Sequence, residues 1–115
     1  MITNANELTI GCELWYIYGH MDRHACRIII ETPILQHALT SFRYVEITSH
    51  SSGNKWTEPM FLGDVGIDKQ QNMNRLFETE EQALAFYDSK ECAQYRYRSA
   101  QYYTADDFDD YEYGD

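Results

Sequence analysis

The stretch HMDRHAC, residues 20–26, brings two histidines and a cysteine close together in the sequence. His20, His24 and Cys26 carry the nitrogen and sulfur atoms that bind zinc in proteins, and Cys12 lies upstream. Structural zinc sites commonly include a closely spaced pair of cysteines, and no such pair occurs in this chain. We therefore interpret the two histidines as flanking a hairpin turn, and we predict no metal site and no cofactor.

Nucleophilic catalysis by a cysteine requires a nearby base that activates the thiol. Cys26 stands at the start of an apolar stretch and Cys92 near the end of an expected helix, and neither lies in a catalytic signature. Small, half-buried residues account for both positions. Carboxylates are abundant, but no two of them stand in an apolar setting that would raise a pKa for acid catalysis. We predict that the protein is not an enzyme and has no catalytic residue.

The stretch FLGDVG, residues 61–66, has the glycines of a phosphate-binding loop but lacks its lysine and its glycine spacing. Gly63 and Gly66 are typical of a bulge or turn, and Asp64 between them can hydrogen-bond the local backbone. A metal bound by Asp64 and Asp68 is the weaker interpretation.

The C-terminal stretch TADDFDDYEYGD, residues 104–115, offers a different chemistry. It holds six acidic residues, three aromatic residues and no basic residue, whereas terminal charge clusters are often simply solvated. Aromatic side chains between carboxylates can bury against a partner while the carboxylates meet Arg and Lys. An idle tail and a partner-binding tail both remain open. The predicted partner-binding residues are Asp106, Asp107, Phe108, Asp109, Asp110, Tyr111, Glu112 and Tyr113.

The whole chain is acidic, with nine basic and nineteen acidic residues and a formal net charge of −10. Binding to a nucleic-acid backbone or to an anionic membrane requires clustered Lys and Arg, so neither is expected. A basic protein that itself handles nucleic acid is the partner that this charge favours.

Aromatic residues make up 15% of the chain and suggest an alternative site. Trp15, Tyr16 and Tyr18 lie in one strand-like stretch and Trp56 lies in another. Pockets for small molecules or nucleotides are commonly lined by such side chains. These four residues are the alternative ligand-binding site.

Four stretches have the composition of strands. Residues 13–19 and 25–31 are rich in aromatic and β-branched residues and are joined by a short polar segment. Residues 42–50 alternate apolar and polar, and SSGN then predicts a turn before a strand over 55–67. Pro59 predicts that this last strand lies at a sheet edge or is bent.

Two stretches predict helices. Thr32 and Pro33 form a start signal for residues 32–42, whose apolar residues repeat at helical spacing. Thr79 and Gln82 fit a capping box for a helix from about residue 80 to the low nineties. The alternating YRYR that follows can extend this helix or form a last strand.

Together these elements predict an α+β fold with a mostly antiparallel sheet of four to five strands and two helices, in the order ββαββα. Residues 1–103 form one domain and residues 104–115 an acidic C-terminal tail. Three widely spaced cysteines fit reduced thiols, and no secretory signal or membrane span is recognisable, so we expect a soluble cytoplasmic protein. An assembly subunit, including a homodimer, is a further interpretation.

The composition, the size and the capped-helix stretch LFETEEQALAFYDS, residues 76–89, resemble the small acidic early proteins of tailed bacteriophages. Several of these bind and inhibit host or defence proteins, and some mimic nucleic acid. The resemblance implies a phage-type inhibitor in the host cytoplasm that occupies a basic nucleic-acid-binding groove. It rests on general character, so no functional residue carries over.

Overall fold

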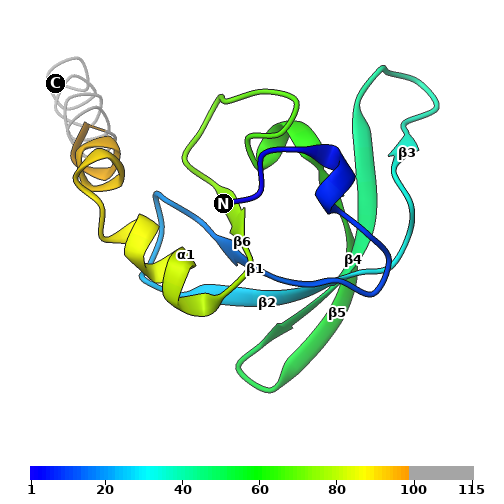
Figure 1. The fold of residues 1–115 in the computed structure, drawn as a ribbon. Coiled ribbons are helices and arrows are strands. Elements are labelled where there is room, and N and C mark those ends of the chain that lie inside the picture. The colour runs from blue at the N-terminus through cyan, green and yellow to red at the C-terminus, as the bar shows by residue number, and fades with distance from the viewer. Residues whose placement is uncertain (99–115) are drawn as a thin grey trace, which may run out of the picture.

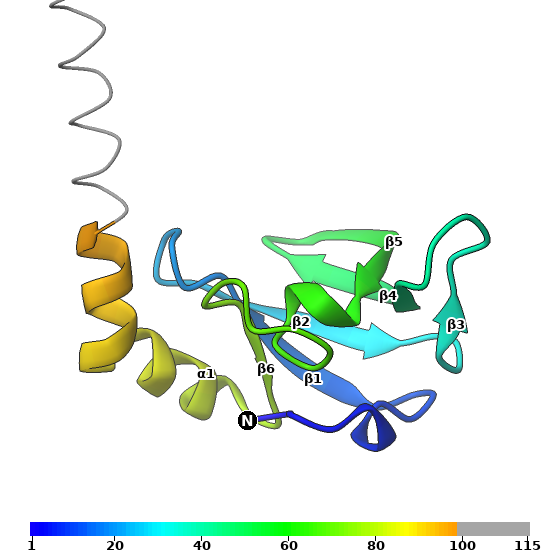
Figure 2. The ribbon, with the colours of Figure 1, turned by 90° about the horizontal axis from the view of Figure 1, so that it is seen from above.

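The computed structural model describes residues 1–98, which form one antiparallel sheet with two helices beside it (Figures 1 and 2). The predicted α+β class is confirmed, but both helices follow the six strands, so the predicted order ββαββα is not the observed one. The elements are a 3₁₀ helix η1 (Ala5–Glu7), β1 (Glu13–Ile17), β2 (Ala25–Ile30), β3 (Leu35–Gln36), β4 (Arg43–Ser51), β5 (Asn54–Phe61), a 3₁₀ helix η2 (Leu62–Asp64), β6 (Arg75–Phe77), α1 (Glu80–Tyr87) and a second helix over residues 90–98.

The sheet is built around β4, the longest strand. One edge of β4 pairs with β5, and the other edge pairs with β2 and then with the short β3. β2 continues the sheet to β1, and β1 pairs with β6. All pairs are antiparallel, so hairpins and short loops suffice to connect most strands.

The strands expected over 13–19, 25–31 and 42–50 are confirmed within the usual boundary error. The turn at 51–54 is confirmed, because Ser52 and Gly53 both have positive φ, as a tight hairpin requires. Pro59 lies in β5, which pairs only with β4, so its expected place in an edge strand is confirmed. β5 ends at Phe61 and a 3₁₀ turn follows, where the sequence predicted strand to residue 67.

The sheet curves strongly, and the N-terminal segment and the loop after β5 lie inside the curve (Figure 1). Side chains of one sheet face pack there with residues of these two segments into the main core. The fully buried members include Ile30 and Val45 from the sheet and Leu62 and Val65 from the loop. This core fills one part of the concave face and leaves another part open.

α1 covers the opposite face. Ala83 on α1 is buried against Ile17, Ala25 and Phe77, and Trp15 packs at the margin of this second cluster. The Thr79 hydroxyl accepts a hydrogen bond from the Gln82 backbone N–H, which confirms the predicted N-cap.

The helix predicted as one unit breaks after Tyr87, and a second helix starts at residue 90. YRYR extends this second helix, so the strand alternative for it is wrong. Arg96 ties this helix to the β1–β2 loop and to α1: its Nη1 donates to the Gly19 carbonyl at 3.1 Å, and its guanidinium lies 3.7 Å from the ring centre of Tyr87.

The helix predicted over residues 32–42 is wrong. Leu35 pairs with Tyr44 of β4, and the Thr32 hydroxyl accepts from the Glu46 backbone N–H instead of capping a helix. Leu39 and Phe42, counted as part of an apolar helix face, are 89% and 51% exposed. The free edge of β4 beyond the end of β2 pairs with this segment, and that pairing overrides its local helical pattern.

The tail residues 104–115 lie outside the described residues. The proposed partner-binding side chains from Asp106 to Tyr113 and the last residues of the expected domain 1–103 therefore have no structural description.

Candidate functional site

The open part of the concave face forms a groove lined by aromatic and acidic side chains. Two adjoining hollows, of about 280 and 330 Å³, share Tyr16, Tyr18 and Glu58 as lining residues. Trp56 and Cys26 also line the first hollow. We call Tyr16, Tyr18, Cys26, Trp56 and Glu58 together the aromatic groove.

Strand register explains why these residues meet. Tyr16 pairs with Cys26 across β1 and β2, and alternate residues of a strand point to the same face. Trp56 and Glu58 stand two residues apart on β5, so their side chains also share a face. β1 and β5 are not paired with each other, yet residues of both line the groove across the curved sheet.

Three of the four aromatic residues predicted as a ligand site thus come together. Tyr16, Tyr18 and Trp56 line the groove, whereas Trp15 packs with the cluster under α1 on the other sheet face. Successive side chains of β1 point to opposite faces of the sheet, so Trp15 lies on the other face from Tyr16.

The two tyrosines stack against each other, with ring centres 4.4 Å apart and an angle of 36° between the rings. Burial, together with the neighbouring Tyr18 hydroxyl and acidic side chains, raises the pKa of Tyr16 well above its ordinary value. Burial, followed by the charge of Glu58, also raises the pKa of Tyr18. Both hydroxyls therefore stay neutral near physiological pH and present uncharged polar atoms to the groove.

Glu58 is the acidic centre of the groove. Its Oε2 accepts a 2.7 Å hydrogen bond from the indole Nε1 of Trp56. Asp22 lines the first hollow and Asp64 the second, whereas no Lys or Arg of the described residues lines either one. The groove thus combines aromatic surface with uncompensated negative charge.

His20, His24 and Cys26 do not converge. The Nε2 of His24 lies 3.0 Å from the Ser51 hydroxyl, and the His20 ring meets the edge of Tyr18 at 6.5 Å. The Cys26 thiol donates to the His50 carbonyl, and burial raises its pKa, which leaves it a weak nucleophile. Over residues 1–98, no group of three or more His, Cys, Asp or Glu is placed to hold a metal ion.

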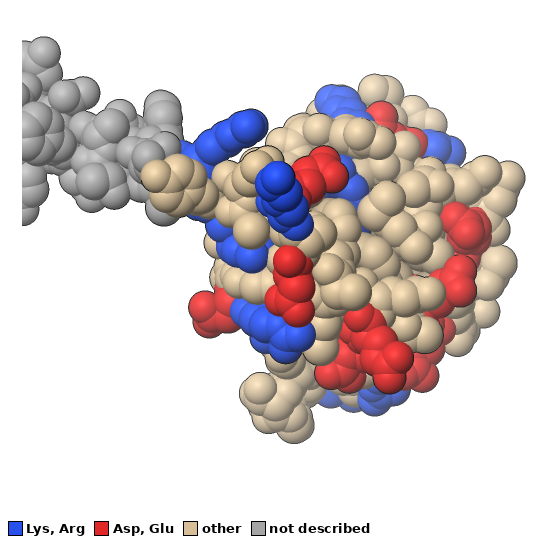
Figure 3. All heavy atoms as spheres, turned by 60° about the vertical axis from the view of Figure 1, so that its left-hand side comes forward, with Lys and Arg blue, Asp and Glu red and all other residues tan. Residues whose placement is uncertain are grey.

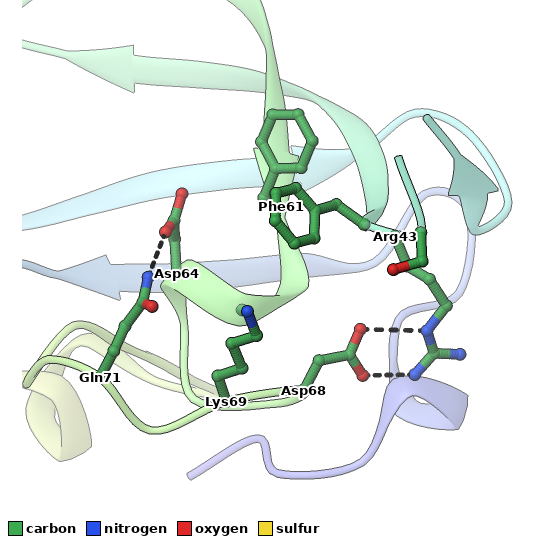
Figure 4. Close-up of a pocket in the computed structure, with 9 residues that line it drawn as sticks. Arg43, Phe61, Asp64, Asp68, Lys69 and Gln71 are labelled. Carbon is green, nitrogen blue, oxygen red and sulfur yellow. Dashed lines mark hydrogen bonds and ion pairs between the residues drawn. The ribbon is translucent and has the colours of Figure 1, made fainter. Parts of the chain in front are cut away.

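A third hollow of about 470 Å³ lies between the β3–β4 loop and the loop after β5 (Figure 4). Arg43 and Asp68 form a two-pronged ion pair in it, with Nε 3.0 Å from Oδ2. Gln71 donates to Asp64, and the Lys69 ammonium lies 4.9 Å from the ring centre of Phe42. Arg43 and Asp68 neutralise each other and Lys69 faces the Phe42 ring, so this hollow offers less to a charged ligand than the aromatic groove.

The glycine-rich stretch 61–66 forms the 3₁₀ turn and a tight bend that border this third hollow. Gly66 has φ +77°, and a Cβ there would lie 2.6 Å from Nε of Arg75. The turn interpretation of its glycines is confirmed.

Charge on the helix side of the molecule is mixed (Figure 3). Lys and Arg side chains are interspersed with Asp and Glu side chains over this face. The acidic groove therefore differs in character from this surface.

Sequence reasoning missed Glu58 and Cys26 as groove residues. Glu58 stands two residues after Trp56, and this spacing alone predicts a shared face. Cys26 requires the β1–β2 register, which the sequence does not specify.

Comparison with known protein families matches residues 2–90 to the phage g100-like proteins. The chain belongs to this family. The match covers the sheet, α1 and every residue of the aromatic groove, whereas residues 104–115 lie outside the matched range. No curated protein and no solved structure matches this phage g100-like protein significantly.

Within residues 1–98, this phage g100-like protein has no helix that is long and apolar enough to cross a membrane.

Proposed function

We propose that this phage protein is a non-catalytic binding protein that recognises a basic bacterial protein in the host cytoplasm. The observation that carries the proposal is the aromatic groove, where Tyr16, Tyr18 and Trp56 surround Glu58 without a lining Lys or Arg. Aromatic side chains supply contact area at low entropic cost, and acidic side chains orient a basic partner.

The net charge of −10 supports the same kind of partner. Residues 104–115 carry six acidic and no basic residues, and they add a second contact with the partner. In the finer form of the proposal, the protein is an inhibitor, and its carboxylates stand in for phosphates in a nucleic-acid-binding groove of a host or defence protein.

The alternative function is binding of a small molecule or nucleotide in the aromatic groove. It is favoured by the convergence of Tyr16, Tyr18 and Trp56 on hollows of ligand size. A phosphate-bearing ligand fits less well, because the lining is acidic and holds no Lys or Arg of the described residues.

Affinity capture from bacterial lysate tests the proposal. Full-length protein, the truncation 1–103, Trp56→Ala and Phe42→Ala are compared at low and high salt. Phe42→Ala is the matched control, since Phe42 is an exposed aromatic residue of the third hollow, outside the aromatic groove. We expect full-length protein and Phe42→Ala to capture one basic protein that handles nucleic acid, and high salt to release it.

Trp56→Ala should weaken this capture, and the truncation should slow association. A captured protein that is acidic, or capture that salt, the truncation and Trp56→Ala all leave unchanged, would overturn the proposal. A nucleotide or other small molecule that raises Tm equally with and without residues 104–115, in the absence of a captured protein, would favour the alternative.

A further inference from the structure

The aromatic groove has the features of a site for one flat cation. Its two hollows meet at Tyr16, Tyr18 and Glu58, so a single side chain can lie across the shared lining. Trp56 lines the groove and is 40% exposed, so part of its surface is free to contact a ligand. We propose that the groove receives an arginine side chain of the partner, an inference that rests on the proposed function.

The first argument is charge complementarity. Asp22, Glu58 and Asp64 line the groove, and within residues 1–98 Glu58 takes part in no ion pair. His24 is the one histidine among the described residues that line the groove, and its Nε2 is already within hydrogen-bond distance of the Ser51 hydroxyl. A positive group entering the groove therefore meets negative charge that no other cation of the described chain neutralises.

The second argument is the position of the carboxylate beside the rings. Oε2 of Glu58 already accepts the hydrogen bond from Nε1 of Trp56, whereas Oε1 accepts none from a donor among residues 1–98. A planar guanidinium can stack on an aromatic ring while its N–H groups donate to a carboxylate at the ring edge. Arginine makes both contacts at once, whereas the compact ammonium of lysine forms a point contact.

The third argument concerns the other occupants that this chain could supply. Residues 104–115 carry six acidic and no basic residues, so like charge opposes their entry into an acidic groove. Arg96 is engaged by the Gly19 carbonyl and the Tyr87 ring, and Arg43 is engaged by Asp68. A partner's arginine is the occupant that the charges favour.

Titration of the ¹⁵N-labelled full-length protein with short peptides tests this inference. One peptide contains a single arginine, a second has citrulline in its place, and a third has lysine. Citrulline keeps the shape of arginine but has no charge. The indole N–H signal of Trp56 reports the groove, and that of Trp15, on the other sheet face, is an internal control.

We expect the arginine peptide to shift the Trp56 signal and leave the Trp15 signal in place. The citrulline peptide should bind about tenfold more weakly or worse, with lysine between the two. Equal shifts with citrulline, or equal shifts of both indoles, would overturn the inference. A lysine peptide that binds more tightly than the arginine peptide would overturn the choice of arginine.

Two variants locate the contact. Glu58→Gln should weaken the arginine peptide about tenfold, because it removes the charge that pairs with the guanidinium. Glu81→Gln removes the same charge from α1, on the other side of the sheet, and should leave the affinity unchanged. Equal losses in the two variants would mean that net charge alone attracts the peptide, and would overturn the site.

Labelling of Cys26 gives a second measurement of occupancy. Cys26 lines the groove, whereas Cys92, a residue of the second helix, is fully buried. The arginine peptide should slow alkylation of Cys26 and leave that of Cys12, which does not line the groove, unchanged. Unprotected Cys26 at saturating peptide would contradict binding in the groove.

Failure of this inference and failure of the proposed function give different results. If Glu58→Gln captures the basic protein from lysate as well as the unchanged chain does, the arginine site is wrong and the proposed function stands. If the arginine peptide binds the groove but no basic protein is captured, the groove chemistry stands and the proposed function is wrong.

Discussion

The indole Nε1 of Trp56 donates a 2.7 Å hydrogen bond to Oε2 of Glu58, two residues farther along the same edge strand. This bond fixes the direction of the indole ring beside the groove and keeps the carboxylate next to it. The edge strand thereby holds an aromatic ring and a carboxylate in place before a ligand binds. Less side-chain entropy is then lost when a cation binds to the pair.

Loss of the Glu58 carboxylate is therefore expected to free the Trp56 indole. In Glu58→Ala, the indole N–H signal of Trp56 should move upfield and exchange faster with solvent, while that of Trp15 stays unchanged. The cost in unfolding free energy should stay below about 1 kcal/mol, because the pair is partly exposed. An unmoved Trp56 signal would show that this hydrogen bond does not persist in solution.

Two surface ion pairs make stability depend on pH. Arg23 pairs with Asp88 and Arg43 with Asp68, and hydrogen bonds from these arginines hold the pKa of both carboxyls below the usual range. A lowered folded-state pKa stabilises the fold fully above the unfolded-state pKa of about 3.9, and the contribution is lost as pH falls through the folded-state value.

Asp68→Asn combined with Asp88→Asn should thus lower Tm at pH 7, and the difference from the unchanged chain should shrink below about pH 4. Thermal unfolding over this pH range measures the effect. Glu78→Gln is the control, since Glu78 is exposed and makes no ion pair within residues 1–98. A Tm difference that persists unchanged at pH 2 would contradict the assignment to these carboxyls.

Arg96 should anchor the second helix more firmly than its charge alone accounts for. Its guanidinium contacts the Gly19 carbonyl and the Tyr87 ring together, and the Tyr87 hydroxyl in turn donates to the Met21 carbonyl at 2.6 Å. Arg96→Lys keeps the charge but loses this planar fit, so it should lower the unfolding free energy by about 1 kcal/mol.

Chemical denaturation of Arg96→Lys and of Arg98→Lys provides the comparison. Arg98 is exposed on the same helix, so its replacement should cost little. Equal costs for the two variants would mean that Arg96 contributes only general charge.

The sequence pattern predicted those elements in which buried and exposed residues alternate with the period of the strand or helix itself. β1, β2, β4 and β5 were recognisable from composition and alternation, and Thr79 from its capping chemistry. Residues 32–42 were not, because the unpaired edge of β4 decides their conformation, and no local signal carries that information. β6 was not predicted, because its three residues are too few to show an alternation of buried and exposed positions.

The site was predictable to a similar extent. Composition pointed to Tyr16, Tyr18 and Trp56, but their meeting depends on sheet curvature and on pairing between distant strands. Cys26 was not predicted as a groove residue for the same reason, because its place beside Tyr16 depends on the pairing of β1 with β2. Once Trp56 is assigned to the groove, strand alternation places Glu58 on the same face. The acidic character of the site could therefore have been predicted from the sequence.

Gly66 is a position where a single added methyl group should lower the free energy of unfolding substantially. Its φ of +77° is a left-handed conformation, and a Cβ would lie 2.6 Å from Nε of the buried Arg75. Nη1 of Arg75 donates to the carbonyls of Asn72 and Asn74 at 2.7 Å, so the guanidinium cannot move away without losing both bonds. Strain, overlap and lost hydrogen bonds therefore act together in Gly66→Ala.

Gly11→Ala separates the backbone strain from the overlap. Gly11 also has a positive φ, +84°, but nothing lies within 4 Å of its Cβ position. Gly11→Ala should cost about 1–2 kcal/mol of unfolding free energy, and Gly66→Ala at least about 1 kcal/mol more. Denaturant unfolding measures both variants. Equal costs would show that Arg75 moves aside freely, and that its carbonyl contacts do not hold the loop before β6 in place.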